Sequence, residues 1–228
     1  MKILHLYPDL MNLYGDHGNI TILVRHLKDL NIPVTVETRD IAELVDFPSY
    51  DLVYMGSGTE RNQLVALKEL KNYEYQLNEY ISSNKLLLLT GNAMELLGQR
   101  IDDEPALNLL DFYTETTDKR FTGDVIVKND TLGEVVGFIN KSSLIHGGEE
   151  DKLFTYEFRD SNLVDNDYEG YHFNNVYGTH IIGPVLVKNP SFLNLVVRSL
   201  ARSQYRSLDY PYETEAYETT LKALKNRK

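Results

Sequence analysis

The first 100 residues alternate between short apolar runs and helix-like patterns, and this alternation constrains the fold more than any other feature. Four segments have the length and composition of strands: residues 2–7 (KILHLY), 33–38 (PVTVET), 51–55 (DLVYM) and 85–90 (KLLLLT). The unbroken apolar run in the last segment is typical of an inner strand of a parallel sheet. The pattern predicts an α/β fold, with a mostly parallel sheet and helices on both faces.

Apolar residues at helical spacing fill the segments between these strands. One set follows the first strand, another follows the third, and residues 92–98 (NAMELLG) are expected to open a helix after the fourth. The two sets are Ile20, Leu23, Val24, Leu27 and Leu30, and Leu64, Leu67, Leu70 and Leu77. Ligands of such sheets bind at the carboxyl ends of the strands, so the turns after residues 7, 55 and 90 mark the expected site.

The second half of the chain has a different pattern. Residues 120–129 and 131–140 are predicted to form a β-hairpin with an Asn-Asp turn at 129–130, and residues 171–187 offer another strand pair. Residues 190–207 and 212–226 are predicted to be terminal helices. No linker rich in Pro, Gly or Ser divides the chain. We expect a single domain over residues 1–228, with the sheet extended by the hairpins.

Composition limits the kinds of function to consider. The chain has no cysteine, which excludes disulfides, thiolate metal sites and a cysteine nucleophile. A net charge of −11 argues against binding of nucleic acid over the whole surface. No apolar run is long enough to span a membrane and no export signal is visible, so we expect a cytoplasmic protein. The basic residues 225–228 (KNRK) are interpreted as a solvated tail.

Two turns at the expected site carry polar or glycine-rich sequences. In residues 56–63 (GSGTERNQ), the backbone N–H groups are suited to hold an anion or an oxyanion, although a purely structural tight turn fits equally well. In residues 13–19 (LYGDHGN), Asp16 or Asn19 is interpreted as the N-cap of the helix that follows.

Neither a hydrolase motif nor a metal motif accompanies these turns. No serine lies in a GxSxG elbow, and Thr90, the hydroxyl nearest to the turn at 91, points to the wrong face to replace a nucleophile there. The histidines show no metal-ligand spacing; residues 146–151 (HGGEED) form a cation-binding or a solvated loop, and we favour the loop. No metal site and no cofactor is expected. His180 is interpreted as a half-buried histidine near a strand end.

Taken in order, several segments resemble a known family. The chain resembles class I glutamine amidotransferase-like domains of the cobyric acid synthase (CobB/CobQ) type, and among them the GatD branch, the glutaminase subunit of lipid II isoglutaminyl synthase. The resemblance covers nearly the whole chain and implies a flavodoxin-like fold. The segments that carry it are LYGDHGNI (13–20), GSGTERNQLVALKEL (56–70), LLGQRI (96–101), LDFYTETTDKRFTGDVIV (110–127), TLGEVVGFIN (131–140) and YGTHIIGPVL (177–186).

The resemblance also implies an activity and a partner. In this family a cysteine on the strand-to-helix elbow attacks the side-chain amide of glutamine, a histidine activates it, and backbone N–H groups stabilise the oxyanion. The released ammonia passes to a Mur-ligase-like (MurT-like) partner, which amidates the stem peptide of lipid II.

The residues of this chain depart from that pattern at the reactive positions. The elbow pattern CGGYQxLG aligns with residues 91–98, so the cysteine position is Gly91 and the glutamine position is Glu95. The pattern GTxxHGP aligns with residues 178–184, so the histidine position is Ile182, with His180 as a vestigial base two residues earlier. Glycine cannot form an acyl-enzyme, and isoleucine cannot accept a proton.

Other positions of the family site persist. They are Arg120, which aligns with an arginine near the glutamine site, the turn residues Gly56, Ser57 and Gly58, and the polar pair Asp16 and Asn19. Ser57 departs from the more usual glycine. These positions are candidates for binding glutamine or another small amino acid without hydrolysing it.

Three hypotheses follow. The first is a GatD-like pseudoenzyme that binds a Mur-ligase-like partner as a scaffold in a heterodimer for peptidoglycan precursor amidation. The second is an active amidotransferase that uses a relocated group such as Thr90, His180 or His146. The third is an amino-acid sensor that binds its ligand through the two turns and Arg120.

Overall fold

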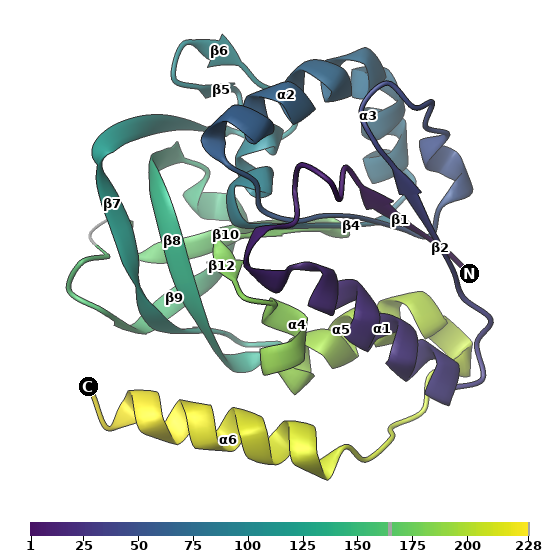
Figure 1. The fold of residues 1–228 in the computed structure, drawn as a ribbon. Coiled ribbons are helices and arrows are strands. Elements are labelled where there is room, and N and C mark those ends of the chain that lie inside the picture. The colour runs from purple at the N-terminus through teal and green to yellow at the C-terminus, as the bar shows by residue number, and fades with distance from the viewer. Residues whose placement is uncertain (164–165, 228) are drawn as a thin grey trace.

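A computed structural model describes residues 1–163 and 166–227 and contains one mixed sheet (Figure 1). Its parallel part runs in the order β2-β1-β3-β4-β11. These strands are β1 (Lys2–Leu6), β2 (Thr35–Arg39), β3 (Leu52–Met55), β4 (Leu86–Thr90) and β11 (Val176–Thr179). The four strands expected in the first 100 residues are therefore confirmed, and the fifth comes from the far end of the chain.

Both faces of the parallel part are covered by helices (Figure 1). Successive residues of a strand point to opposite faces, so Val53 packs with α2 and α3 while Leu52 packs with α1 and α5. The helices of the first layer are α2 (Glu60–Leu70) and α3 (Glu74–Ser82), and those of the second are α1 (His17–Asp29), α4 (Val185–Lys188) and α5 (Pro190–Ala201). The predicted α/β architecture is confirmed.

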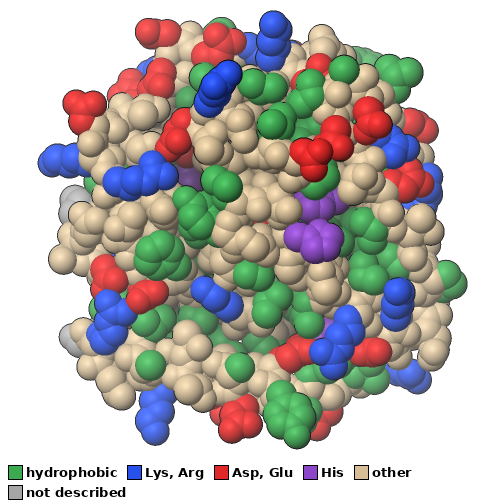
Figure 2. Space-filling model, viewed as in Figure 1, with side chains coloured by type: hydrophobic (Ala, Val, Ile, Leu, Met, Phe, Trp, Pro, Cys, Tyr) green, Lys and Arg blue, Asp and Glu red, His purple; other side chains and the backbone are tan. Residues whose placement is uncertain are grey.

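The second half of the chain extends the sheet with antiparallel strands. The order β12-β8-β7-β9-β10 continues from β11, and a short pair, β5 and β6, adjoins β7. These strands are β5 (Arg100–Ile101), β6 (Glu104–Pro105), β7 (Phe112–Asn129), β8 (Gly133–Gly147), β9 (Lys152–Arg159), β10 (Tyr168–Phe173) and β12 (Ile181–Ile182). The expected hairpin at 129–130 is confirmed, but its strands are longer than predicted. Figure 2 shows acidic and basic side chains interspersed on this face of the molecule.

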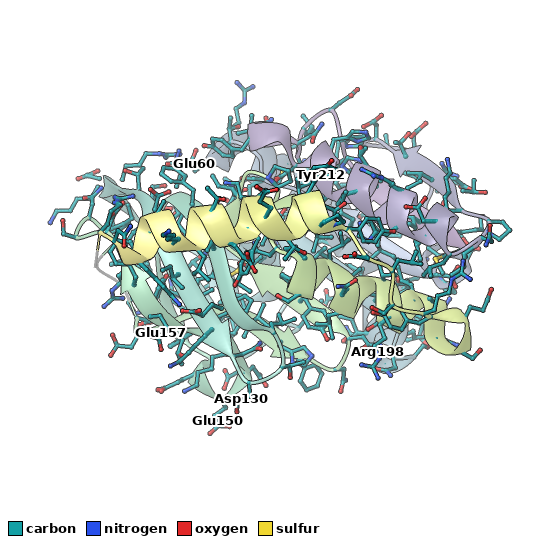
Figure 3. All side chains as sticks on the ribbon, turned by 90° about the horizontal axis from the view of Figure 1, so that it is seen from below. Glu60, Asp130, Glu150, Glu157, Arg198 and Tyr212 are labelled. Carbon is teal, nitrogen blue, oxygen red and sulfur yellow. The ribbon has the colours of Figure 1, made fainter. Side chains whose placement is uncertain are left out.

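The C-terminal helix α6 (Pro211–Lys225) lies across β7 and β8 (Figure 3). Leu224 packs on Ile126 and Val136 of these strands. The sequence suggested a solvated tail at residues 225–228, and this interpretation is wrong for the described residues after the helix. Arg227 Nη1 lies 2.5 Å from Asp124 Oδ2 and its Nη2 lies 2.6 Å from Asp160 Oδ1, so the basic end is held on an acidic part of the sheet. Lys228 lies outside the described residues.

Two helix predictions and one strand prediction need correction. The expected helix through residues 64–77 is two helices, and α2 leaves Leu64 exposed while it buries Gln63. The helix expected after β4 is a 3-10 helix, Gly91–Leu97, in which every residue except Asn92 is buried. A segment enclosed in this way has no solvent-facing side for an amphipathic α-helix. The strand pair expected at 171–187 is present, but residues 185–188 form the short helix α4 rather than a strand.

Candidate functional site

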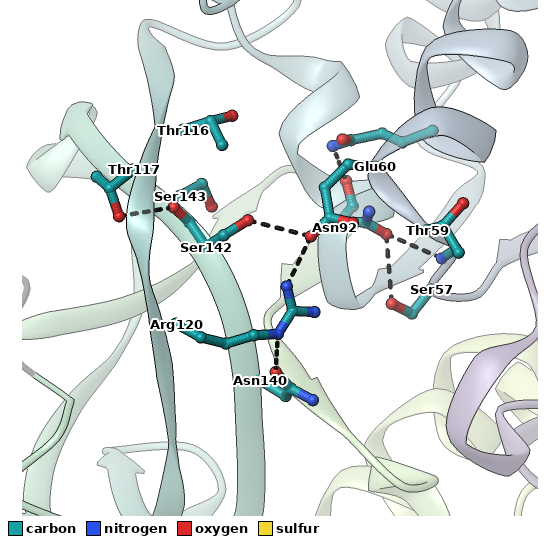
Figure 4. Close-up of polar contacts among 12 residues, drawn as sticks. Ser57, Thr59, Glu60, Asn92, Thr116, Thr117, Arg120, Asn140, Ser142 and Ser143 are labelled. Atoms are coloured by element: carbon teal, nitrogen blue, oxygen red, sulfur yellow. Dashed lines mark hydrogen bonds and ion pairs between the residues drawn. The ribbon is translucent and has the colours of Figure 1, made fainter.

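A small polar pocket lies at the carboxyl edge of the parallel strands, as the turn positions predicted. The turns after β1, β3 and β4 meet there with the facing parts of β7 and β8 (Figure 4). The free space is about 20 Å³, which is room for roughly one water molecule. The lining residues are Tyr14, Ser57, Gly58, Glu60, Gln63, Asn92, Glu95, Thr116, Arg120, Asn140, Lys141, Ser142 and Ser143.

The two positions that the sequence aligned with the reactive residues of the resembling family, Gly91 and Ile182, lie next to each other. Gly91 follows β4 directly, and a Cβ atom placed on it would lie 3.2 Å from Cγ2 of Ile182. The same Cβ atom would overlap both Cβ and Oγ of Ser57. Gly91 has a φ of +61°, a conformation that a side chain would strain in any case. The space beside Gly91 is therefore filled by Ser57, so that a side chain at position 91 has no room.

In the part of the chain that the structure describes, the hydroxyl of Ser57 is bonded to an amide oxygen and not to a base. Ser57 Oγ donates to Oδ1 of Asn92 over 3.3 Å, an amide oxygen with negligible basicity. The Ser57 backbone N–H donates to Oδ2 of Asp16 at 2.6 Å. A hydroxyl in this setting is a hydrogen-bond donor and not a nucleophile.

Asp16 and Asn19 support the site from behind, and neither caps α1. The side chain of Asp16 makes no capping bond to this helix; instead its first N–H, that of His17, donates to the side-chain Oδ1 of Asn12 at 2.8 Å. Asp16 is 0% exposed and holds the glycine-rich turn, and burial raises its pKa to about 6 against the opposing hydrogen bonds from Ser57 and Thr90. Asn19 accepts the Leu186 N–H at 2.8 Å and so joins α1 to α4. The capping interpretation is wrong for both residues.

His180 belongs to a buried group of acidic and basic side chains beside the pocket. Its Nε2 lies 2.9 Å from Oε1 of Glu95, and its backbone N–H donates to Oε1 of Glu169 at 2.6 Å. Burial raises the pKa of Glu95, but the hydrogen bonds from His180, Ser143 and Gln63 outweigh it, so the pKa is lowered overall. Burial raises the pKa of Glu169 above its usual value. His180 is thus engaged by carboxylates rather than by the residues around Gly91.

The remaining candidates divide between the pocket and its surroundings. Arg120 lines the pocket, where its Nη1 lies 2.9 Å from Oε1 of Glu60. Gly56 packs against Asp16, where a Cβ atom would lie 2.7 Å from Oδ2. Thr90 is 0% exposed and shares a 2.9 Å hydrogen bond with the Tyr54 hydroxyl.

His146 is not brought to the pocket. Its ring stacks on Tyr113 with 4.8 Å between ring centroids, and its Nε2 lies 3.4 Å from Glu115. Within residues 1–163 and 166–227, no group of three or more His, Cys, Asp or Glu side chains is arranged to hold a metal ion.

Sequence reasoning missed several residues that shape the site. Glu60 accepts a hydrogen bond from Arg120, and Asn92 accepts one from the backbone N–H of Gly58. Asn140 and Ser142, on the same face of β8, contact Arg120 and Glu60. The spacing of Asn140 and Ser142 could have indicated this, since alternate residues of a strand point to the same face. The pairing of Glu95 with His180 had no such signal, because these residues are 85 positions apart.

The fold and the position of the pocket define a glutamine amidotransferase-like protein. The chain belongs to the CobB/CobQ-like glutamine amidotransferase domain family, whose model matches residues 2–190. This confirms the family resemblance found in the sequence.

The relatives include two GatD proteins. The lipid II isoglutaminyl synthase (glutamine-hydrolyzing) subunit GatD of Staphylococcus aureus is 34% identical over 198 residues, which cover 83% of this chain and 79% of the relative. The same subunit of Streptococcus pneumoniae is 28% identical over 213 residues, 90% of this chain and 82% of the relative. A crystal structure of a glutamine amidotransferase shares the fold with a TM-score of 0.58 at 15% identity, covering 87% of this chain and 98% of that one.

None of the helices in the described part of the chain is both long enough and apolar enough to cross a membrane.

Proposed function

We propose that this chain is a GatD-like subunit of a lipid II-amidating enzyme, and that it has no glutaminase activity of its own. It acts in the cytoplasm as the binding or scaffold subunit of a heterodimer with a Mur-ligase-like (MurT-like) partner. The relationship to two GatD proteins supports the pathway. With this subunit inert, the partner draws ammonia from solution or from another donor.

One observation carries the inactive assignment. Position 91, directly after β4, holds a glycine, and Ser57 fills the space that a side chain at this position would need. The neighbouring position 182 holds an isoleucine. A glutaminase of this family needs a nucleophile and a base at these two points. Neither glycine nor isoleucine offers a lone pair or an exchangeable proton on its side chain.

The two alternatives have unequal support. The relocated enzyme is disfavoured, because Thr90 and His180 are both buried and already hydrogen-bonded to other side chains. The amino-acid sensor has one observation in its favour. Arg120 lines the pocket beside Asn140, and its guanidinium, which Glu60 pairs with in this structure, is the type of group that binds a carboxylate ligand.

The test is a glutaminase assay with a partner-binding measurement on the same samples. The purified chain, alone and mixed with a purified Mur-ligase-like protein from the same organism, is incubated with glutamine while glutamate is measured. S. aureus GatD serves as the positive control. We expect no glutamate above the no-enzyme background, together with co-elution of the chain and its partner in size-exclusion chromatography. Glutamate release comparable to that of the control would refute the inactive assignment, and absence of co-elution would refute the scaffold role.

A further inference from the structure

The guanidinium of Arg120 already holds a carboxylate that belongs to the chain itself. Glu60 Oε1 accepts from Arg120 Nη1 at 2.9 Å and from Ser142 Oγ at 3.0 Å, while Arg120 Nε donates to Asn140 Oδ1 at 2.7 Å (Figure 4). The hydrogen bond from Arg120 lowers the pKa of Glu60, so its carboxylate is ionised at neutral pH. The anion-binding position of the pocket is therefore filled.

The donor of the glycine-rich turn is occupied in the same way. The backbone N–H of Gly58 donates to the side-chain carbonyl Oδ1 of Asn92 at 2.9 Å. This N–H is the kind of group that would otherwise hold a substrate carbonyl oxygen. Asn92 is fixed by a second contact, because Gln63 Nε2 donates to its backbone oxygen at 2.7 Å.

These two internal groups together have the chemistry of one small ligand. A carboxylate on a guanidinium and a primary carboxamide on a backbone N–H are the two ends of a glutamine molecule. We infer that Glu60 and Asn92 are built-in occupants of this pocket, standing where the carboxylate and carboxamide of an amino-acid ligand would bind.

The free volume leads to the same inference. The space of about 20 Å³ that remains among these side chains takes roughly one water molecule and not an amino acid. A ligand can enter only after Glu60 and Asn92 swing out. Its apparent affinity is then reduced by the small fraction of molecules that are open. The inference uses the pocket of the proposed function and adds the reason why that pocket does not take up free glutamine.

The test is calorimetric titration of L-glutamine and L-glutamate into the wild type and the Glu60→Ala/Asn92→Ala double variant. In the wild type we expect no measurable binding. In the double variant we expect an affinity at least about tenfold higher than the weakest affinity that the titration detects, because the closed form is no longer favoured. Adding Arg120→Ala to the double variant should abolish the gain. Glu218→Ala, which removes an exposed carboxylate on α6, is the matched control and should titrate like the wild type.

Two results would overturn the inference. One is wild-type binding as tight as that of the double variant; the other is a double variant that melts cooperatively and still binds no better than the wild type. If the double variant does not fold, Glu60→Gln replaces it, since this change keeps the shape and weakens the contacts of the carboxylate with Arg120 and Ser142. A smaller affinity gain then supports the inference, and unchanged binding refutes it. Glutamate release, read on the same samples, tests the proposed function separately.

Discussion

Replacement of Gly91 by alanine measures how firmly the reactive position is closed. A Cβ atom at position 91 meets Cβ of Ser57, which is fixed by the backbone and cannot rotate away as Oγ can. Two costs therefore add. A φ of +61° costs a non-glycine residue about 1–2 kcal/mol, and overpacking of a buried contact costs about 1–3 kcal/mol more.

The chain contains a matched control for the first cost. Gly133 has a φ of +68°, and a Cβ atom placed there has nothing within 4 Å. Gly133→Ala therefore carries the backbone cost alone. We expect it to lower the free energy of unfolding by about 1 kcal/mol, and Gly91→Ala to lower it by about 2–5 kcal/mol.

The decisive comparison is a double-mutant cycle, with each free energy measured by urea unfolding. In the Ser57→Gly background the overlap with Ser57 is absent and only the 3.2 Å contact with Cγ2 of Ile182 remains, so the cost of Gly91→Ala should fall close to that of Gly133→Ala. The coupling energy between positions 57 and 91 should be about 1–3 kcal/mol. If the two substitutions are additive within about 0.5 kcal/mol, the overlap is relieved by other means and the reasoning fails.

Three further predictions concern the same site. The Ser57→Gly/Gly91→Cys/Ile182→His triple variant should release glutamate from glutamine faster than the Gly91→Cys/Ile182→His pair; equal rates would mean that Ser57 does not obstruct the position. Glu95→Gln removes the buried carboxylate that is hydrogen-bonded to His180, Ser143 and Gln63, and it should lower the free energy of unfolding by about 3 kcal/mol; a thermal midpoint within 1–2 °C of wild type (roughly 0.5 kcal/mol) would contradict this. The pKa of Asp16 is raised to about 6 in the folded chain, so its contribution to stability is present below its unfolded pKa and is lost as the pH rises towards 6. Asp16→Asn should therefore gain about 2–3 kcal/mol relative to wild type between pH 4 and pH 7 in urea unfolding, and an unchanged difference would refute the assignment.

The sequence was informative where one face or both faces of an element are buried. Residues 86–89 form an inner strand whose side chains are buried on both faces of the sheet. An unbroken run of apolar residues indicates burial of this kind. Since parallel strands end at the same edge, the meeting of the turns after β3 and β4 could also be predicted.

Prediction failed where tertiary contacts decide the structure. The segment Gly91–Leu97 has helical composition, yet it forms a 3-10 helix that is buried at every residue except Asn92. The basic residues at the end of the chain look solvated in sequence, but Asp124 and Asp160 lie together only after β7 and the segment following β9 have been brought side by side. Occupation of the pocket by Glu60 and Asn92 depends in the same way on pairings between distant segments.

The packing of Ser57 against Gly91 also bears on the order of past substitutions. A chain with serine at position 57 and any side chain at position 91 would be overpacked. If the ancestor carried the cysteine of its family at position 91, the change to glycine came first or together with the serine. Once both were in place, a single reversion at position 91 would destabilise the fold without restoring the base at position 182. With such an ancestor, no single substitution at position 91 would restore a nucleophile without overpacking the site, and a serine at position 57 would mark relatives in the same situation.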